Sequence, residues 1–391
     1  MPLKKLAFAT LLVVLSSLSF AQAPLIIALD ADLSAVAKTG GIAIKRGASI
    51  AINEINTAGG VLGRNLELKT FDHRGNPARG IANINKIATL DNVVAVMGGV
   101  HTPVAIQELP ALHEHELIYL DPWAAGTPVI DNGYEPNYAF RVSVRDAEAG
   151  KVIIGAAKKD GIKKIALLLG KNGWGRSNEK SMTIAASEFG VEIVAKEWFN
   201  WKQTNMTREF AAIAKSGAQA VVFVANAPEG AVSLKQMLSE DTTKNLKIYS
   251  HWGIAGGEFV EAVGLESLTM ANIKVLQTYS FLKPANPALN AQVLAAYQDM
   301  FDANATAESI QGAVGVAQSY DLIYLLKMAI EKAGSTQRPL VRNALEQLPN
   351  YQGLLKHYTP AFSPTQHDSL WAEDYFMSEY NERGFLVPVE K

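Results

Sequence analysis

The chain has 391 residues, a formal net charge of −2 and no cysteine. Charged residues make up 19% of it and its pI is about 6.4, so nothing indicates binding to nucleic acid or to an anionic membrane surface. The length is too great for one ordinary core and suits two domains. Without cysteine, the protein has no disulfide, no thiol nucleophile and no cysteine that could carry a lipid.

The N-terminus has the pattern of a secretory signal. Lysines at positions 4–5 form a positive region, residues 6–18 form an apolar segment, and an A-x-A cleavage site ends at Ala23. A membrane anchor is the weaker interpretation, because a spanning helix needs about 20 apolar residues. We expect residues 1–23 to be a signal peptide, and the mature chain to be a soluble periplasmic protein rather than a lipoprotein.

Apolar runs alternate with helical patterns in the first half of the chain. Runs such as VVAVMG are almost continuously apolar, as is typical of strands covered on both faces by helices. Strands are predicted at 25–31, 65–72, 93–98 and 117–120, and helices at 41–58, 77–90 and 103–115. This alternation predicts right-handed crossovers and a doubly wound parallel sheet.

The same alternation then starts again. Strands are predicted at 164–169, 191–195, 220–225, 246–250 and 273–278, with helices at 175–189, 207–216 and 229–238. Two long helical patterns, 289–301 and 313–333, precede a strand-like tail at 371–380. The predicted fold class is therefore α/β, with two doubly wound parallel-sheet lobes.

Enzymatic motifs are weak or absent. The glycine-rich segment 170–176 (GKNGWGR) lacks both the GK[ST] ending of a P-loop and the spacing of GxGxxG. The run His113-Glu114-His115 is not HExxH, and residues two apart on a helix do not share a face. No GxSxG elbow is present. The sequence therefore gives little support to an enzyme.

The most specific stretch is RGASIAINEINTAGGVLGRNLELKTFDHRGNP, from Arg46 to Pro77. Its first part has one apolar helical face, Gly59-Gly60 ends that helix, and an alternating strand follows. The string AxxEINxAGGVLGRxLEL, followed by an acidic residue and a GxP turn, resembles the first helix–strand unit of the periplasmic type I solute-binding proteins. Within them it is most similar to the branched-chain amino-acid-binding group.

This resemblance implies a three-segment hinge and a ligand in the cleft between two closing lobes. By position, the crossings fall near 140–145, 276–281 and 354–362. Lobe 1 would comprise 24–142 plus 282–353, and lobe 2 would comprise 143–281 plus 354–391. The resemblance implies a monomer that needs no cofactor or metal and delivers a small molecule to the membrane permease of an ABC transporter. A sensory receptor is the alternative partner, and a secreted enzyme is the weaker rival.

Polar and aromatic residues just after the predicted strands are the best site candidates, because ligands of open α/β sheets bind there. The competing interpretation of each is loop or interlobe packing. We predict ligand binding by Ser34, His101, Thr102, Trp123, Ala124, Ala125, Trp174, Asn226, His251 and Trp252. By the resemblance, Thr102 and the backbone amides of 123–125 would hold a carboxylate, and closure would bring Trp174, Asn226 and Trp252 over the ligand.

One departure from the group bears on the ligand. Its amino-acid binders usually carry an acidic residue in the second lobe for the ligand ammonium, whereas the matching segment 250–253 here is Ser-His-Trp-Gly. A buried ammonium without a carboxylate would be costly, although Glu229 or Glu258 could supply one. The tryptophans suit an aromatic or amphipathic carboxylate, or a cationic group. The ligand stays open between these and an amino acid.

Overall fold

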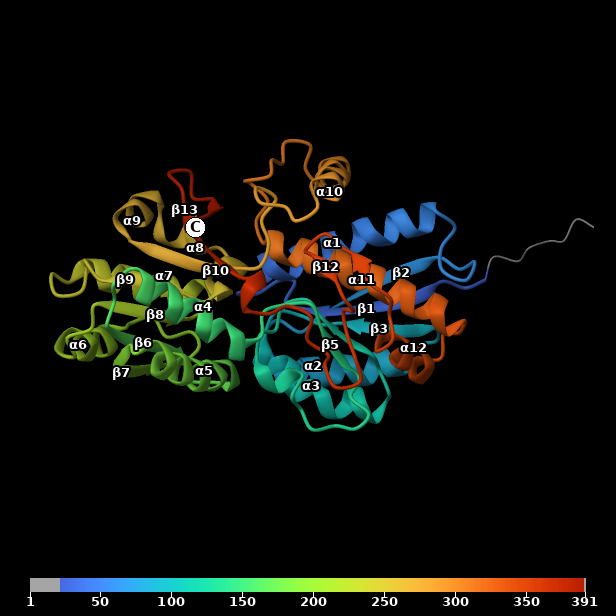
Figure 1. Cartoon of the computed structure of the whole chain (residues 1–391), viewed down its shortest axis with the longest axis horizontal. Coiled ribbons are helices and arrows are strands. Elements are labelled where there is room, and N and C mark those ends of the chain that lie inside the picture. The colour runs from blue at the N-terminus through green and yellow to red at the C-terminus, as the bar shows by residue number, and fades with distance from the viewer. Residues whose placement is uncertain (1–21, 390–391) are drawn as a thin grey trace, which may run out of the picture.

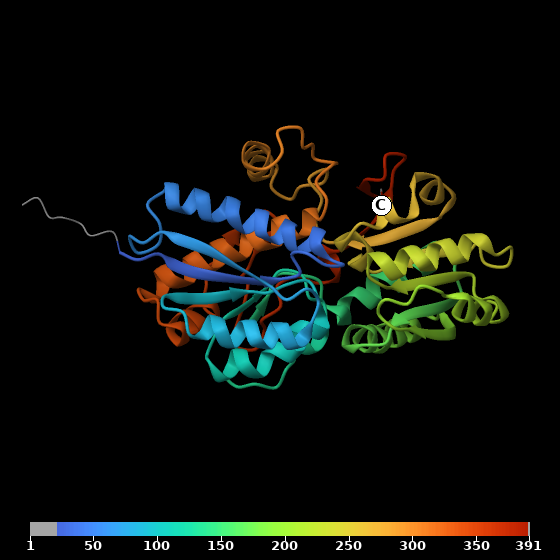
Figure 2. The same ribbon diagram turned by 180° about the vertical axis from the view of Figure 1, so that it is seen from behind.

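Two α/β lobes lie next to each other along the long axis of the molecule (Figures 1 and 2). The structure is a computed structural model and describes residues 22–389, so the predicted signal segment falls almost entirely outside the described residues. Within 22–389, no helix has the length and apolar character needed to cross a membrane.

The first lobe is built on a parallel sheet in the order β2-β1-β3-β4-β5. Its strands are β1 (Leu25–Ala31), β2 (Leu66–Asp72), β3 (Val93–Met97), β4 (Tyr119–Asp121) and β5 (Ala139–Arg141). The first four were predicted from the sequence, and β5 was not. Every residue of β3 is buried because helices cover both faces of the sheet.

Six helices of the described chain belong with this sheet. They are α1 (Lys38–Thr57), α2 (Pro77–Ala88), α3 (Thr102–Glu114), α10 (Pro287–Met300), α11 (Ala313–Ala333) and α12 (Arg338–Leu345). Helices α1 and α11 pack on one face, and α2 and α3 on the other. Gly47 permits the close contact of α1 with α11, since a Cβ there would lie 2.0 Å from the carbonyl oxygen of Val316.

The second lobe is built on a sheet in the order β14-β13-β10-β9-β8-β6-β7. Its parallel part contains β6 (Lys164–Gly170), β7 (Glu192–Phe199), β8 (Ala220–Val224), β9 (Lys247–Ser250) and β10 (Ile273–Gln277), all predicted from the sequence. Two antiparallel strands, β13 (Phe376–Tyr380) and β14 (Leu386–Pro388), extend one edge. The predicted tail strand at 371–380 is wrong in its first part, because the Asp374 carboxylate accepts from the Trp371 amide and closes a 3₁₀ turn.

Helices cover both faces of this sheet as well. They are α4 (Asp146–Lys159), α5 (Gly173–Phe189), α6 (Thr207–Lys215), α7 (Ala227–Ser239), α8 (Phe259–Val263) and α9 (Leu265–Met270). The sequence predicted α5, α6 and α7 but not α4, α8 or α9. Helices α4 and α5 pack together on one face. One buried apolar cluster continues from the first lobe through Trp123 and Trp252 into the second.

The last part of the chain returns to the second sheet later than expected. After the short hairpin β11 (Tyr351–Gln352) and β12 (His357–Tyr358), the Arg141 amide donates to the carbonyl of His367, and the Ser369 amide donates to the carbonyl of Arg141. We therefore propose that the third crossing follows Ser369 rather than lying at 354–362. The other lobe boundaries remain as proposed from the sequence.

Candidate functional site

A small cavity lies between the lobes, at the carboxyl ends of strands from both sheets. Seven of the ten predicted residues line it: His101, Thr102, Trp123, Ala125, Trp174, Asn226 and Trp252. The open space measures about 20 Å³, room for about one water molecule. The topology thus brings together side chains that follow β3, β4, β6, β8 and β9.

Several tryptophan rings line the cavity. Trp123 of the first lobe meets Trp252 of the second with ring centroids 5.2 Å apart and planes tilted by 36°. Gly315 of α11 makes room for Trp123, because a Cβ there would lie 2.9 Å from its ring. Such a tilted contact is favourable for two aromatic rings, and it restricts the orientation of both side chains.

The Trp174 indole has a different feature. Its Nε1 is buried and has no hydrogen-bond partner among the described residues. Asn172, at the N-cap of α5, accepts from the Trp174 amide and fixes the backbone from which this ring enters the cavity. The indole N–H is therefore available to a ligand acceptor.

His101 supplies a polar edge to the cavity. Its Nε2 lies 3.0 Å from Oδ2 of Asp32, and both side chains are buried. Burial by itself would raise the pKa of Asp32, but the hydrogen bond from His101 and the amide of Ala37 bring that pKa below its usual value. The Asp32 carboxylate is thus ionised, and it orients His101 with the Nε2 proton pointing at it.

The predicted carboxylate site is only partly available. The Thr102 hydroxyl accepts from the Gly126 amide at 3.0 Å and keeps its own proton to donate. The amides of Trp123 and Ala124 both donate to Oδ1 of Asp121, at 2.9 and 2.7 Å, so the prediction that they hold a ligand is corrected. The Ala125 amide has no acceptor within residues 22–389.

Three predicted residues do not line the cavity. The Ser34 hydroxyl is exposed and donates to Asp72. Ala124 lies behind the wall, with its carbonyl accepting from Arg141. His251 is fully buried, and it accepts from the Trp252 amide through Nδ1, so that Nε2 donates to Asp146. Each was predicted from its place after a strand, and hydrogen bonds with distant parts of the chain direct it elsewhere.

Sequence reasoning missed Trp201, which lines the cavity. The signal that could have found it is the end of β7. The strand was predicted to stop at residue 195 but continues to Phe199, which places Trp201 just past its carboxyl end. Strand-end position is the rule that located the other tryptophans, and it applies here once the strand has its full length.

No aspartate or glutamate lines the cavity in the part of the chain that the structure describes. Glu229 is buried nearby, but its Oε1 accepts from the Lys202 amide at 2.7 Å. Glu258 forms an exposed ion pair with Lys38. Neither residue lines the cavity, so neither is placed to act as the acidic partner that the sequence left open. The described residues also contain no group of three or more His, Cys, Asp or Glu that could hold a metal.

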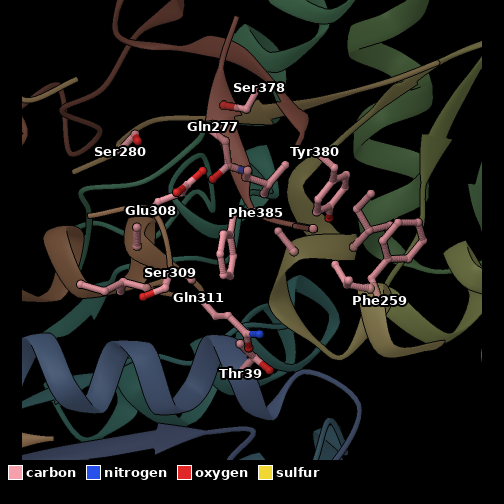
Figure 3. A pocket seen from close by; sticks show the side chains of 18 of the residues that line it. Thr39, Phe259, Gln277, Ser280, Glu308, Ser309, Gln311, Ser378, Tyr380 and Phe385 are labelled. Carbon is pink, nitrogen blue, oxygen red and sulfur yellow. The ribbon is translucent and has the colours of Figure 1, made fainter. Parts of the chain in front are cut away.

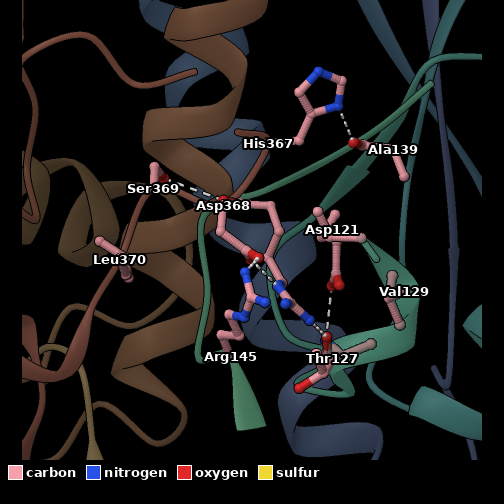
Figure 4. Close-up of polar contacts among 12 residues, drawn as sticks. Asp121, Thr127, Val129, Ala139, Arg145, His367, Asp368, Ser369 and Leu370 are labelled. Carbon is pink, nitrogen blue, oxygen red and sulfur yellow. Dashed lines mark hydrogen bonds and ion pairs between the residues drawn. The ribbon is translucent and has the colours of Figure 1, made fainter. Parts of the chain in front are cut away.

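A buried ion pair fixes the wall that carries Trp123 (Figure 4). Arg141 Nε donates to Asp368 at 2.5 Å, and Arg141 Nη1 donates to the carbonyls of Ala124 and Gly126 at 3.0 and 2.8 Å. Arg145 donates to the other oxygen of Asp368. One carboxylate thus joins β5, the start of α4 and the returning C-terminal segment.

A second interlobe pocket of about 70 Å³ lies near Thr39, Gln277 and Tyr380 (Figure 3). Across it, Glu308 contacts the side chains of Asn381 and Arg383. These contacts tie the loop before α11 to the C-terminal hairpin of the other lobe.

Comparisons with known proteins agree with this architecture. The profile of the family described as periplasmic binding protein matches residues 24–383. The Leu/Ile/Val-binding protein BraC3 of Rhizobium johnstonii is 28% identical over 347 residues, which cover 86% of this chain and 87% of that protein. Leu/Ile/Val-binding protein homolog 3 of Brucella melitensis is 25% identical over 339 residues, 86% of each chain.

Solved structures share the fold. A type 1 periplasmic binding protein of Bordetella pertussis superposes with a TM-score of 0.84 at 21% identity, over 94% of this chain and all of that one. A solute-binding protein of an R. palustris ABC transporter, in complex with 4-hydroxybenzoate, superposes with a TM-score of 0.77 at 19% identity, over 94% of this chain and 96% of that one. LivJ of Streptococcus pneumoniae, in complex with isoleucine, superposes with a TM-score of 0.78 at 19% identity, over 94% of this chain and 100% of that one.

The chain therefore belongs to the periplasmic binding protein family, and it is a solute-binding protein of the type I, branched-chain amino-acid group rather than an enzyme. The resemblance of the segment from Arg46 to Pro77 is confirmed.

Replacing Thr102 with valine should lower the free energy of unfolding by about 1–2 kcal/mol, because the buried Gly126 amide loses its acceptor. Urea unfolding measures the loss. Thr102→Ser keeps the hydroxyl and should stay close to the parent. A valine variant as stable as the parent would show that this hydrogen bond does not contribute to stability.

Proposed function

We propose that this protein is the periplasmic solute-binding component of an ABC importer, and that it captures a small carboxylate-bearing solute in the interlobe cavity by hinge closure. Among such solutes, an aromatic or amphipathic carboxylate fits better than an α-amino acid. The observation that carries the proposal is a cavity walled by tryptophans with no acidic side chain among its described lining residues. An α-ammonium would be buried there without a counter-charge.

Three donors could hold the carboxylate. The Thr102 hydroxyl, the Ala125 amide and the indole N–H of Trp174 lie on the wall of one cavity and come from both lobes. A carboxylate accepts such bonds at both oxygens, and they are stronger than bonds between neutral groups. Its remaining body would lie against the rings of Trp123 and Trp252, where aromatic contact is favourable.

Entry of any such solute requires the lobes to separate. The cavity of about 20 Å³ has room for about one water molecule. Contacts also join the two lobes, including the hydrogen bond from the Thr127 amide to the Ser177 hydroxyl at 3.1 Å. Hinge opening of the kind known for periplasmic binding proteins would admit the ligand, and closure would then surround it.

The similar proteins support a shared chemistry. Relatives are named as Leu/Ile/Val-binding proteins, and structural neighbours include complexes with isoleucine, 4-hydroxybenzoate and benzoate. A carboxylate is common to all these ligands. The ammonium is not, and this chain lacks an acid to receive it in the described cavity.

The test is a thermal-shift and calorimetric panel of isoleucine, leucine, benzoate and 4-hydroxybenzoate, using the chain from Pro24 onward. A ligand at about 100 times its dissociation constant should stabilise the protein by roughly 2.7 kcal/mol, a shift of several degrees. We expect shifts with the aromatic carboxylates and none in a Trp252→Ala variant. A shift with isoleucine or leucine alone would contradict the aromatic assignment.

We also propose that residues 1–23 direct the protein to the periplasm and are then removed, and that the mature protein acts as a monomer. N-terminal sequencing of the exported protein should begin at Pro24. Size-exclusion chromatography with light scattering should give one chain. An uncleaved N-terminus or a stable dimer would overturn the respective statement.

A further inference from the structure

The turn that carries Trp201 is held by an unusual set of bonds. The Asn200 amide donates to the side chain of Gln203 at 3.0 Å, and Lys202 adopts a φ of +64°, which is uncommon for a residue other than glycine. The Lys202 amide donates to Oε1 of Glu229 at 2.7 Å. The bond to Glu229 comes from a different element, α7, so it fixes the turn relative to the rest of the lobe.

Burial of the Glu229 carboxylate at this position is unfavourable for the free energy of folding. Glu229 is 2% exposed, and its Oε2 has no hydrogen-bond partner among the described residues. Burial of a carboxylate oxygen without a partner disfavours folding. Asn226, three residues earlier at the start of the same helix, lines the cavity. The first turn of α7 therefore supplies a cavity residue and, beside it, the anchor of the Trp201 turn.

The Trp201 ring reaches across the interface between the lobes. It meets His101 of the first lobe edge-on, with ring centroids 5.4 Å apart. His101 is itself fixed by Asp32. The ring thus belongs to the second lobe but completes the cavity only where the two lobes touch.

We propose that Trp201 is a specificity-determining residue of the cavity and that Glu229 positions it through the Lys202 amide. The flat ring favours a flat aromatic carboxylate over a branched aliphatic amino acid, because offset and edge-on contacts between rings add to apolar burial. This inference rests on the proposed function, since it assigns selectivity within the same cavity.

The binding experiment compares dissociation constants for 4-hydroxybenzoate and isoleucine by calorimetry. Trp201→Ala should weaken 4-hydroxybenzoate about tenfold and change isoleucine about twofold or less. Glu229→Ala should reproduce this loss of selectivity, whereas Glu229→Gln should retain it, because the glutamine oxygen can still accept from Lys202. The double variant should lose no more than Trp201→Ala. Trp198→Phe is the matched control, since Trp198 lies on β7 but does not line the cavity.

A second readout needs no ligand. In protein labelled with 5-fluorotryptophan, Trp201→Phe identifies the Trp201 fluorine resonance. That resonance should shift in Glu229→Ala and stay in place in Glu229→Gln. An unmoved resonance in Glu229→Ala would overturn the positioning role, even if that variant were less stable.

The outcomes separate the two proposals. Equal weakening of 4-hydroxybenzoate and isoleucine in Trp201→Ala would overturn the specificity role and leave the proposed function standing. Absence of binding by every member of the panel to the parent protein would overturn both. Loss of selectivity in Glu229→Gln as large as in Glu229→Ala would show that the charge of Glu229, rather than its bond to the Lys202 amide, is what matters, and would also overturn the positioning role.

Discussion

Replacing Asp368 with alanine should lower the free energy of unfolding by about 3–5 kcal/mol, because the Arg141 guanidinium would stay buried without its counter-charge. Both side chains are fully buried. Burial by itself would lower the pKa of Arg141, but the neighbouring Asp368 carboxylate raises it overall, so the guanidinium keeps its charge.

Urea unfolding of the parent and the variant measures this loss. Asp131→Ala is the matched control, because Asp131 pairs with Arg145 of the same network but is half exposed, and exposed pairs contribute about 0–1 kcal/mol. If Asp368→Ala lost no more than this control, the buried pair would not hold the wall of the cavity. We also expect weaker ligand binding, since Arg141 fixes the carbonyls of Ala124 and Gly126.

The second large effect is a decrease in stability as the pH rises. Burial raises the pKa of Asp30 to about 7, and burial together with the nearby Asp30 raises that of Glu108 well above its usual value. The folded protein therefore keeps protons that the unfolded chain releases above about pH 4. This stabilising contribution is complete below that pH and is lost as the pH rises through about 7. We expect these two groups together to contribute a decrease on the order of 3 kcal/mol between pH 5 and pH 8. Asp121, whose pKa burial raises to about 7, adds to this decrease, whereas His73, whose pKa burial lowers to about 3, opposes it below about pH 6.5.

Glu108→Gln should remove part of this decrease. The neutral amide cannot repel Asp30, so the variant should match the parent near pH 5 and be more stable by about 1–3 kcal/mol at pH 8. Glu114→Gln, on the exposed side of the same helix, should keep the slope of the parent. Urea unfolding at pH 5, 6, 7 and 8 provides the test. A Glu108→Gln variant with the same pH slope as the parent would contradict the prediction.

Local patterns located most of the fold. Each strand at 25–31, 164–169 and 220–225 lies within a residue or two of its predicted ends, because an apolar run flanked by turn residues is a local signal. Helix α4 was missed, as were the short helices α8, α9 and α12. The tail at 371–380 failed for a different reason, since one side-chain bond from Asp374 turns the backbone.

The cavity shows where strand-end reasoning works and where it stops. It located His101, Thr102 and Trp174, because the carboxyl ends of parallel strands meet at one edge of each sheet. It could not predict that Asp121 would accept a hydrogen bond from the Trp123 amide, or that Asp72 would accept one from the Ser34 hydroxyl. Those bonds depend on side-chain directions, which position along a strand does not specify.

By itself, the sequence determined the α/β class, the two lobes and the family, because periodicity and the segment from Arg46 to Pro77 are properties of neighbouring residues. Only the tertiary structure decided which groups face the ligand and what holds them. Arg141 and Asp368 are 227 residues apart, and Glu229 of helix α7 accepts a hydrogen bond from Lys202 in the turn after β7. Such pairs form only when the lobes are folded, since a buried charge selects its partner by position in space rather than by distance along the chain.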